Sequence, residues 1–220
     1  MEYFLYALIA VCCYFLGNIS GGRIVSSFKH IDITNTGSGN PGTLNTWRAC
    51  GFWPGVLTFV IDMIKGVVAS LTAFLIAKPL GLNQEIALYV AGISVIIGHI
   101  FPIIFNFKGG KGIATSAGVF LVANWWVTLI VFVCMIVCML FIKYASIFTV
   151  GFVIIMSIVE ICLCSPANWI NYILICGILA LVIFAHRANI KRLLTGKENK
   201  TELLAMLKGL GKKKQSEEAK

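Results

Sequence analysis

The stretch "WPGVLTFVIDMIKGVVASLTAFLIA", residues 53–77, carries only two charged side chains. About 18 consecutive apolar residues are enough for one α-helix to cross the hydrocarbon core of a bilayer. Similar runs lie on both sides of it, so the whole chain is 59% hydrophobic and only 12% charged. Ordinary soluble domains carry about 25% charged residues. The composition therefore predicts a polytopic membrane protein.

The fold class follows from how a chain satisfies its backbone in lipid. Only α-helices and closed β-barrels span the dry hydrocarbon core, and the alternating pattern of barrel strands is absent from this sequence. The sequence thus predicts an all-α fold, a transmembrane bundle of seven helices. Five helices are the alternative, if residues 145–185 make a single crossing. The seven apolar runs cover roughly 3–26, 53–77, 85–105, 113–123, 125–142, 146–164 and 168–185.

Positive charge predicts the orientation of this bundle. Basic residues lie in the 27–50 loop, in the 106–112 loop and beyond residue 186, where ten of the 18 Lys and Arg are found. Loops rich in Lys and Arg stay on the cytoplasmic side of a membrane. All three regions then face the cytoplasm, which requires an even number of crossings between the second loop and the C-terminus. Dividing residues 113–142 at "ANWW", residues 123–126, gives that number and leaves the N-terminus outside.

The C-terminal end of the chain reads as a basic tail. We expect one transmembrane domain over residues 1–200 and a cytoplasmic tail over 201–220, whose charge suits the anionic lipids of an inner (cytoplasmic) membrane. No nucleic-acid-binding module accompanies the formal charge of +9, so no nucleic-acid partner is expected. The eight cysteines lie mostly in apolar runs, without the pattern of a metal site or a disulfide framework.

A first polar segment, "GSGNPGTLNTWRACG", spans residues 37–51. Its glycines, with an Asn-Pro pair, predict a tight irregular turn rather than a helix. Such a turn can point several backbone N–H groups at one anion. Ser38 adds a hydroxyl, Asn45 an amide, and Arg48 a planar fork that fits two phosphate oxygens. The alternative is a plain linker with Arg48 at the lipid headgroups.

A second polar segment, "NFKGGKGIATSAG", spans residues 106–118. It is not a P-loop, because Gly112 stands where Ser or Thr must follow the lysine. It still predicts a glycine turn that leads into a helix N-terminus, a place that favours anions. Lys108 and Lys111 add positive charge. The alternative is a set of glycine turns that carries ordinary cytoplasmic charge.

A third polar segment, "FAHRANIKRLLTGKENK", spans residues 184–200 and is predicted to leave the last apolar run as an interfacial helix. Three residues separate His186 from Asn189, so the two side chains share one helix face. A histidine at a membrane exit can relay protons or bind an anion, although a structural role is the more common one. Glu198 is expected to pair with Arg192 or with a cytoplasmic lysine.

Other charges lie inside the apolar runs. Asp62 and Lys65, three residues apart on one helix, are expected to form a structural pair, because unpaired charges are costly in the membrane. The sequence offers Glu160 no evident partner. His99 is interpreted as structural rather than catalytic.

Together the three segments resemble a known family, the bacterial acyl-phosphate:glycerol-3-phosphate acyltransferases of phospholipid synthesis. "GSGN" with Asn45 and Arg48 is similar to the first motif of that family. "GHIFPIIFNFKGGKGIAT", residues 98–115, is similar to the second and is the most specific match. "HRANIKRLLTGKEN", residues 186–199, is similar to the third. The chain departs from the family pattern at Pro41, Thr43, Leu44 and Ala188.

The resemblance implies a membrane enzyme that transfers an acyl group from acyl phosphate to the sn-1 hydroxyl of glycerol 3-phosphate, without a metal or other cofactor. The products are 1-acyl-glycerol 3-phosphate (lysophosphatidic acid) and inorganic phosphate, on the cytoplasmic face, and a monomer is plausible. The alternative is a transporter or binder of a phosphorylated metabolite. The roles that the resemblance implies are catalytic for Ser38, Arg48, His186 and Asn189, substrate-binding for Asn45, Lys108, Gly109, Gly110, Lys111, Gly112 and Ser146, and structural for Asp62, Lys65 and Glu198.

Overall fold

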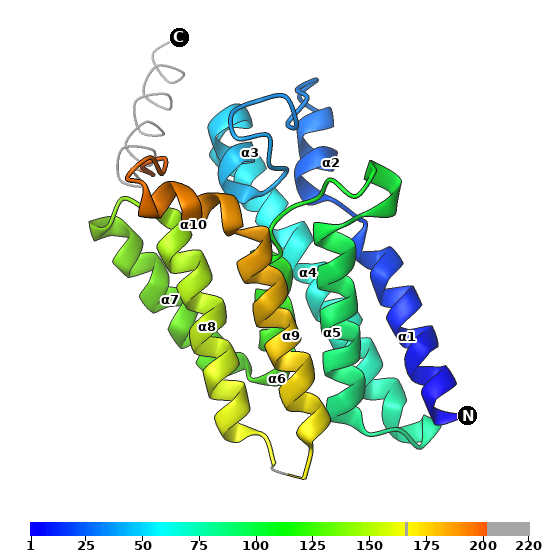
Figure 1. The fold of residues 1–220 in the computed structure, drawn as a ribbon. Coiled ribbons are helices and arrows are strands. Elements are labelled where there is room, and N and C mark those ends of the chain that lie inside the picture. The colour runs from blue at the N-terminus through cyan, green and yellow to red at the C-terminus, as the bar shows by residue number, and fades with distance from the viewer. Residues whose placement is uncertain (166, 202–220) are drawn as a thin grey trace.

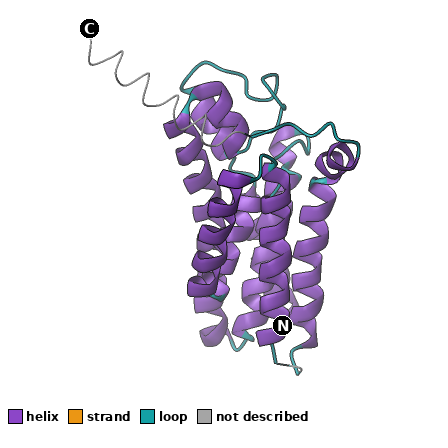
Figure 2. Ribbon diagram, turned by 90° about the vertical axis from the view of Figure 1, so that its left-hand side faces the viewer, coloured by secondary structure: helices purple, strands orange, loops and turns teal. Residues whose placement is uncertain are grey.

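A computed structural model describes residues 1–165 and 167–201 of the chain. In these residues all the regular secondary structure is helical, which confirms the all-α prediction (Figure 1; Figure 2). Apart from Thr201, the predicted basic tail lies outside the described residues.

The long helices run side by side and form the bundle in Figure 1. Among the described residues, four helical stretches are long and apolar enough to cross a membrane, or five if a bent pair near the C-terminus counts as one span. Two further apolar helices, α6 and α7, are shorter than these. The helices of this bundle are α1 (Glu2–Gly17), α4 (Phe52–Ala77), α5 (Gln84–Ile100), α6 (Ile113–Ala123), α7 (Trp125–Phe141), α8 (Ala145–Leu163) and α9 (Trp169–Ala185).

Three short helices gather at the end of the bundle opposite the N-terminus (Figure 1). They are α2 (Gly21–Ser27), α3 (Thr43–Cys50) and α10 (Arg187–Leu194), and α10 bends away from α9 by 59°. Two 3₁₀ turns, Lys78–Leu80 and Ile103–Phe105, follow α4 and α5.

Two sequence predictions need correction at this end of the bundle. The apolar run 3–26 is interrupted at residues 18–20, where Ser20 caps a new helix by accepting from the amide of Arg23. The segment 37–51 is irregular only up to Gly42. Its second half is the helix α3, because the carbonyl of Gly42 accepts both the amide and the hydroxyl of Thr46 and so starts a helical turn.

The core lies around α5, which packs against α1, α4 and α9. Glycines allow two of the main helix contacts to bring backbones together. A Cβ atom on Gly98 would lie 2.0 Å from the carbonyl oxygen of Tyr14, and one on Gly118 would lie 2.1 Å from that of Met63. Small residues at such contacts let transmembrane helices approach closely. Helices α1, α4, α5 and α6 therefore form a tightly joined half of the bundle.

Polar contacts also join the helices at the end near the N-terminus. The side-chain amides of Asn168 and Asn171 both donate to Glu85 Oε2, at 2.7 and 3.0 Å. Glu160 has a partner after all, because the hydroxyl of Tyr89 donates to its Oε2 at 2.8 Å. Residues 145–185 contain the two separate helices α8 and α9, side by side in Figure 1.

Candidate active site

One pocket of about 260 Å³ brings together residues from all three predicted polar segments. Its walls come from the 38–48 region, from the start of α6, from the start of α8, and from the turn between α9 and α10. Segments more than a hundred residues apart in sequence therefore meet at one place. Of the predicted site residues, those that line the pocket are Ser38, Asn45, Arg48, Asp62, Lys111, Gly112, Ser146, His186, Asn189 and Glu198.

The first segment reaches the pocket through a loop that Asn45 holds closed. The buried side chain of Asn45 accepts from the amide of Ser38 at 2.9 Å and donates to the carbonyls of Ile33 and Thr36. Gly37 takes a positive φ of 61°, which glycine adopts without strain. Asn45 is thus committed to the loop, while Ser38 is exposed and faces the pocket. Arg48, on α3, donates from Nη2 to the hydroxyl of Thr201 at 2.7 Å.

In the second segment, the residues that line the pocket begin at Lys111, further along the chain than predicted. The amides of Gly109 and Gly110 donate to the last carbonyls of α5, those of Ile100 and His99, at 3.1 and 3.0 Å. Within the described residues, the amides of Lys111 and Gly112 have no such partner, and both residues line the pocket. The open N–H groups therefore belong to Lys111, Gly112 and the start of α6. Lys108, Gly109 and Gly110 lie outside the pocket lining.

The third segment supplies a polar network centred on Glu198. Its carboxylate accepts from the side-chain amide of Asn189 at 2.7 Å, from Arg192 Nε at 2.9 Å, and from the hydroxyl of Ser146. The predicted pairing with Arg192 is confirmed. Burial raises the pKa of Glu198, but these hydrogen bonds outweigh it and hold the pKa below its usual range. A permanent carboxylate thus fixes α10 against the start of α8.

Lys111 is the most strongly perturbed cation at the pocket. Burial, together with the positive charges of Arg192 and Arg48, lowers its pKa to about 8, although Glu198 acts in the opposite direction. Its ammonium group donates to Asn189 Oδ1 at 2.6 Å. Three cations thus lie at a site where Glu198 is their nearest carboxylate, because Asp62, the other carboxylate of the lining, is paired with Lys65. A bound anion would relieve their mutual repulsion.

His186 lies at the bend between α9 and α10 and is only 3% exposed. Its Nδ1 lies 2.9 Å from the carbonyl oxygen of Val182. A carbonyl oxygen only accepts, so Nδ1 must carry the proton and Nε2 is left as an acceptor. Burial, helped by the charge of Lys111, lowers the pKa of His186 to about 4, so the ring is neutral near pH 7. A neutral acceptor of this kind can orient a hydroxyl group.

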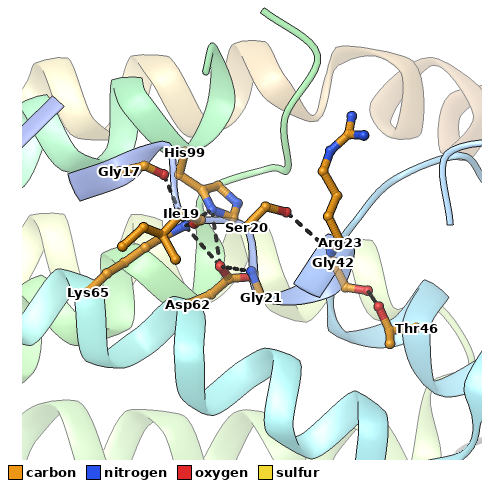
Figure 3. A network of polar contacts seen from close by, with 10 residues as sticks. All are labelled: Gly17, Ile19, Ser20, Gly21, Arg23, Gly42, Thr46, Asp62, Lys65 and His99. Atoms are coloured by element: carbon orange, nitrogen blue, oxygen red, sulfur yellow. Dashed lines mark hydrogen bonds and ion pairs between the residues drawn. The ribbon is translucent and has the colours of Figure 1, made fainter. Parts of the chain in front are cut away.

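Beneath the pocket lies a buried polar network, drawn in Figure 3. Lys65 Nζ donates to Asp62 Oδ1 at 2.9 Å and to the carbonyls of Gly17 and Ile19, and it lies 2.7 Å from His99 Nδ1. Asp62 also accepts from the amide of Gly21 at 3.1 Å. The predicted pair of Asp62 and Lys65 is confirmed, and His99 is its third member.

Thr201 and His99 are among the contributors to the pocket that sequence reasoning missed. Thr201 lines it and bonds Arg48, while its own amide donates to the carbonyl of Lys143. Threonine after a basic segment carries no signal of such a contact. His99 also lines the pocket, and its place in "GHIFPIIFNFKGGKG" directly before the glycine loop was a usable signal.

The inner end of the pocket is apolar. Side chains from α4, α7 and α8 surround it, and the rings of Phe59 and Phe132 stack at 5.4 Å. The apolar lining residues are Phe59, Phe132, Met135, Ile136, Met139, Phe148 and Phe152. The pocket thus has a cationic part and an apolar part. Fold and site together define a helical membrane protein with one such pocket among the described residues.

Comparison with known proteins agrees with this class. The sequence profile described as glycerol-3-phosphate acyltransferase matches residues 7–196, and the chain belongs to this family of enzymes. It is 40% identical to the glycerol-3-phosphate acyltransferase of Clostridioides difficile (strain 630), over 91% of this chain and 97% of that protein. It is 34% identical to that of Aquifex aeolicus (strain VF5), over 87% of this chain and 97% of that protein.

Solved structures extend the comparison to the fold. The chain is similar to crystal structures of PlsY, an integral membrane glycerol 3-phosphate acyltransferase, in glycerol 3-phosphate and lysophosphatidic acid forms. The TM-scores are 0.81 and 0.80 at 34% sequence identity, over 92% of this chain and 98% of the PlsY chain in both cases. The architecture is thus that of an integral membrane protein.

Proposed function

We propose that the protein transfers an acyl group from acyl phosphate to the sn-1 hydroxyl of glycerol 3-phosphate. The products are 1-acyl-glycerol 3-phosphate and inorganic phosphate, and the reaction is the first acylation step of phospholipid synthesis. Membership of the family supports the reaction type. The two PlsY crystal forms are described as holding glycerol 3-phosphate and lysophosphatidic acid, the acceptor and the product of this reaction.

The observation that carries the proposal is the convergence of three polar segments on one pocket with an apolar inner end. Both proposed substrates carry phosphate, and acyl phosphate also carries a hydrocarbon chain. Arg48, Lys111 and Arg192 supply positive charge, and the open amides at Lys111 and Gly112 supply directed donors. Cations and helix N-termini together bind phosphate well. The apolar end offers room for the acyl chain.

The proposed chemistry is direct transfer. The glycerol 3-phosphate oxygen attacks the acyl carbonyl carbon, the bond from that carbon to the phosphate oxygen breaks, and phosphate leaves with the electron pair. His186 Nε2 accepts a hydrogen bond from the attacking hydroxyl. With a pKa of about 4, His186 does not keep a full proton near pH 7. The hydroxyl proton therefore departs with the phosphate. Orientation and stabilisation of charge then supply the rate enhancement.

Individual roles follow from where the side chains lie. We assign phosphate binding to Arg48, Lys111 and Gly112, with Ser38 as an added donor. Asn189 and Ser146 act through Glu198, which holds them in place. Asn45 shapes the loop that presents Ser38. Because Lys108, Gly109 and Gly110 lie outside the pocket lining, their proposed part in substrate binding is indirect.

The same proposal includes the topology. Seven crossings place the three polar segments on the cytoplasmic face of the inner membrane, the N-terminus outside and the C-terminus inside. α6 and α7 together make two of these crossings. We further propose one domain over residues 1–200, a basic tail beyond it and a monomeric enzyme. Attaching an impermeant maleimide to Lys78→Cys and Lys197→Cys, in a cysteine-free background, tests the orientation. Labelling of residue 78 only from outside supports it, and labelling of residue 197 from outside contradicts it.

The reaction itself is tested by phosphate release from palmitoyl phosphate, with and without glycerol 3-phosphate, by the purified protein in nanodiscs. We expect release that depends on the acceptor, together with lysophosphatidic acid. Arg48→Ala should lose at least about tenfold in kcat/KM, because a charge-assisted contact is removed. Lys29→Ala, an exposed cation in the loop before Arg48, is the matched control and should keep its activity. Folded protein without acceptor-dependent release would overturn the proposal, and uptake of substrate into liposomes without product would favour transport.

A further inference from the structure

The glycine loop rests directly on α5. Gly110 is buried, and its amide donates to the carbonyl of His99, the residue before the last of the helix. A Cβ atom on Gly110 would lie 2.1 Å from His99 Nε2 and 2.7 Å from His99 Cε1. A Cβ atom on Gly109 would instead lie 2.0 Å from the carbonyl oxygen of His99 and 2.6 Å from Pro102 Cδ. The imidazole edge thus occupies the space where residue 110 would carry a side chain.

The ring of His99 is itself fixed from the other side. Its Nδ1 lies 2.7 Å from Lys65 Nζ and 3.6 Å from Asp62 Oδ1 (Figure 3). An ammonium group has donors only, so Nδ1 must accept, and the ring proton resides on Nε2, facing Gly110. Lys65 is held in turn by Asp62 and by the carbonyls of Gly17 and Ile19. The ring of His99 is therefore held by Lys65, and Lys65 is held by Asp62 and two backbone carbonyls.

Gly110 directly precedes Lys111, which lines the pocket and whose ammonium group donates to Asn189. A displacement of Gly110 therefore moves the proposed phosphate donors as well. Because catalytic geometry is sensitive to shifts of about 1 Å, the height of this loop above α5 matters for binding.

We propose that His99 is a positioning residue for the phosphate-binding loop. Its imidazole edge, held by Lys65 and Asp62, sets the height of Gly110 and thereby places Lys111 and Gly112 for the acyl phosphate. This inference rests on the proposed function and gives His99 a role that it exerts through Gly110.

The test is a double-mutant cycle between Gly110→Ala and His99→Asn. Asparagine is shorter than histidine and leaves the space beside residue 110 free, while its amide oxygen can still accept from Lys65. Groups in contact show strong coupling in such cycles. We expect Gly110→Ala alone to raise KM for palmitoyl phosphate by about tenfold, and by less than about twofold in the His99→Asn background. KM for glycerol 3-phosphate should change by less than about twofold throughout.

Gly109→Ala is the matched control, because its clash is with the backbone of His99 and with Pro102. Its effect should be the same in both backgrounds, since asparagine keeps the backbone carbonyl. Equal effects of Gly110→Ala in the two backgrounds would overturn the proposal, as would relief of Gly109→Ala by His99→Asn.

A second measurement separates this inference from the proposed reaction. Thermal unfolding in nanodiscs, followed for the same four proteins, reports the contact without turnover. Gly110→Ala should lower the Tm much less in the His99→Asn background than in the wild-type protein. If the wild-type protein releases no phosphate, the proposed function fails and the cycle in Tm alone decides whether His99 supports residue 110. If His99→Asn does not fold, His99→Ala takes its place in both cycles.

Discussion

The binding of acyl phosphate should weaken above about pH 8, because Lys111 loses its proton there. Burial is the main reason that the pKa of this lysine falls to about 8, and Arg192 and Arg48 add to the effect. One pH unit beyond a pKa reduces the protonated fraction of a group by about tenfold. A phosphate dianion binds protonated Lys111 more tightly than the neutral amine. In the limit where only the protonated form binds, KM for palmitoyl phosphate should rise by about eightfold between pH 8.5 and 9.5.

The assay is KM for palmitoyl phosphate from pH 6.5 to 9.5, with glycerol 3-phosphate saturating. Lys111→Arg provides the control, because a guanidinium stays charged over this whole range. In that variant KM starts higher, since Arg does not reproduce the lysine geometry, but it should not rise with pH. The bound anion raises the pKa of Lys111. The decline of kcat at alkaline pH should therefore begin at a higher pH than the decline of kcat/KM. If KM for palmitoyl phosphate still rises above about pH 8 in Lys111→Arg, another group is responsible, and the role given to Lys111 is refuted.

Three further predictions follow from contacts described above. Lys111→Met should abolish activity but raise the Tm, because a cation that is buried and close to two others disfavours the folded state; a fall in Tm would contradict this account. Asp62→Ala should cost about 3–5 kcal/mol in unfolding free energy, because it leaves Lys65 as an unpaired buried charge, and Asp62→Ala combined with Lys65→Met should recover part of the loss in chemical denaturation. Thr201→Ala should keep kcat/KM within about threefold of wild type, because the hydroxyl contributes one hydrogen bond to Arg48 that substrate phosphate replaces; a loss above that range would place Thr201 in the reaction itself.

The apolar runs made the helices predictable, because a membrane leaves the backbone little choice. The pair of Asp62 and Lys65 was predictable for a similar reason, since residues three apart on a helix are neighbours. The break at residues 18–20 also had a signal, because Ser20 follows Gly17 and Asn18 and is a good N-cap. A longer apolar pattern on both sides concealed it.

Contacts between distant parts of the chain could not be predicted from the sequence. Tyr89 and Glu160 are 71 residues apart, and Arg48 and Thr201 are 153 residues apart, so no local pattern could link them. The glycine loop was identified from its sequence, but its contacts with the rest of the fold were not. "KGGKG" indicated where backbone comes close to another group, but it did not show that Gly109 and Gly110 approach α5. Only the fold reveals that the donors left open belong to Lys111 and Gly112.

The local pairing in α4 also bears on how the chain enters the membrane. Asp62 and Lys65 emerge during synthesis well before His99, the third member of their network. Because they lie one helical turn apart, they can neutralise each other inside α4 alone, whereas each charge by itself costs about 2.5–3.5 kcal/mol at the centre of an inserting helix. Helix α4 can thus be released into lipid early, and α5 can complete the network when it arrives.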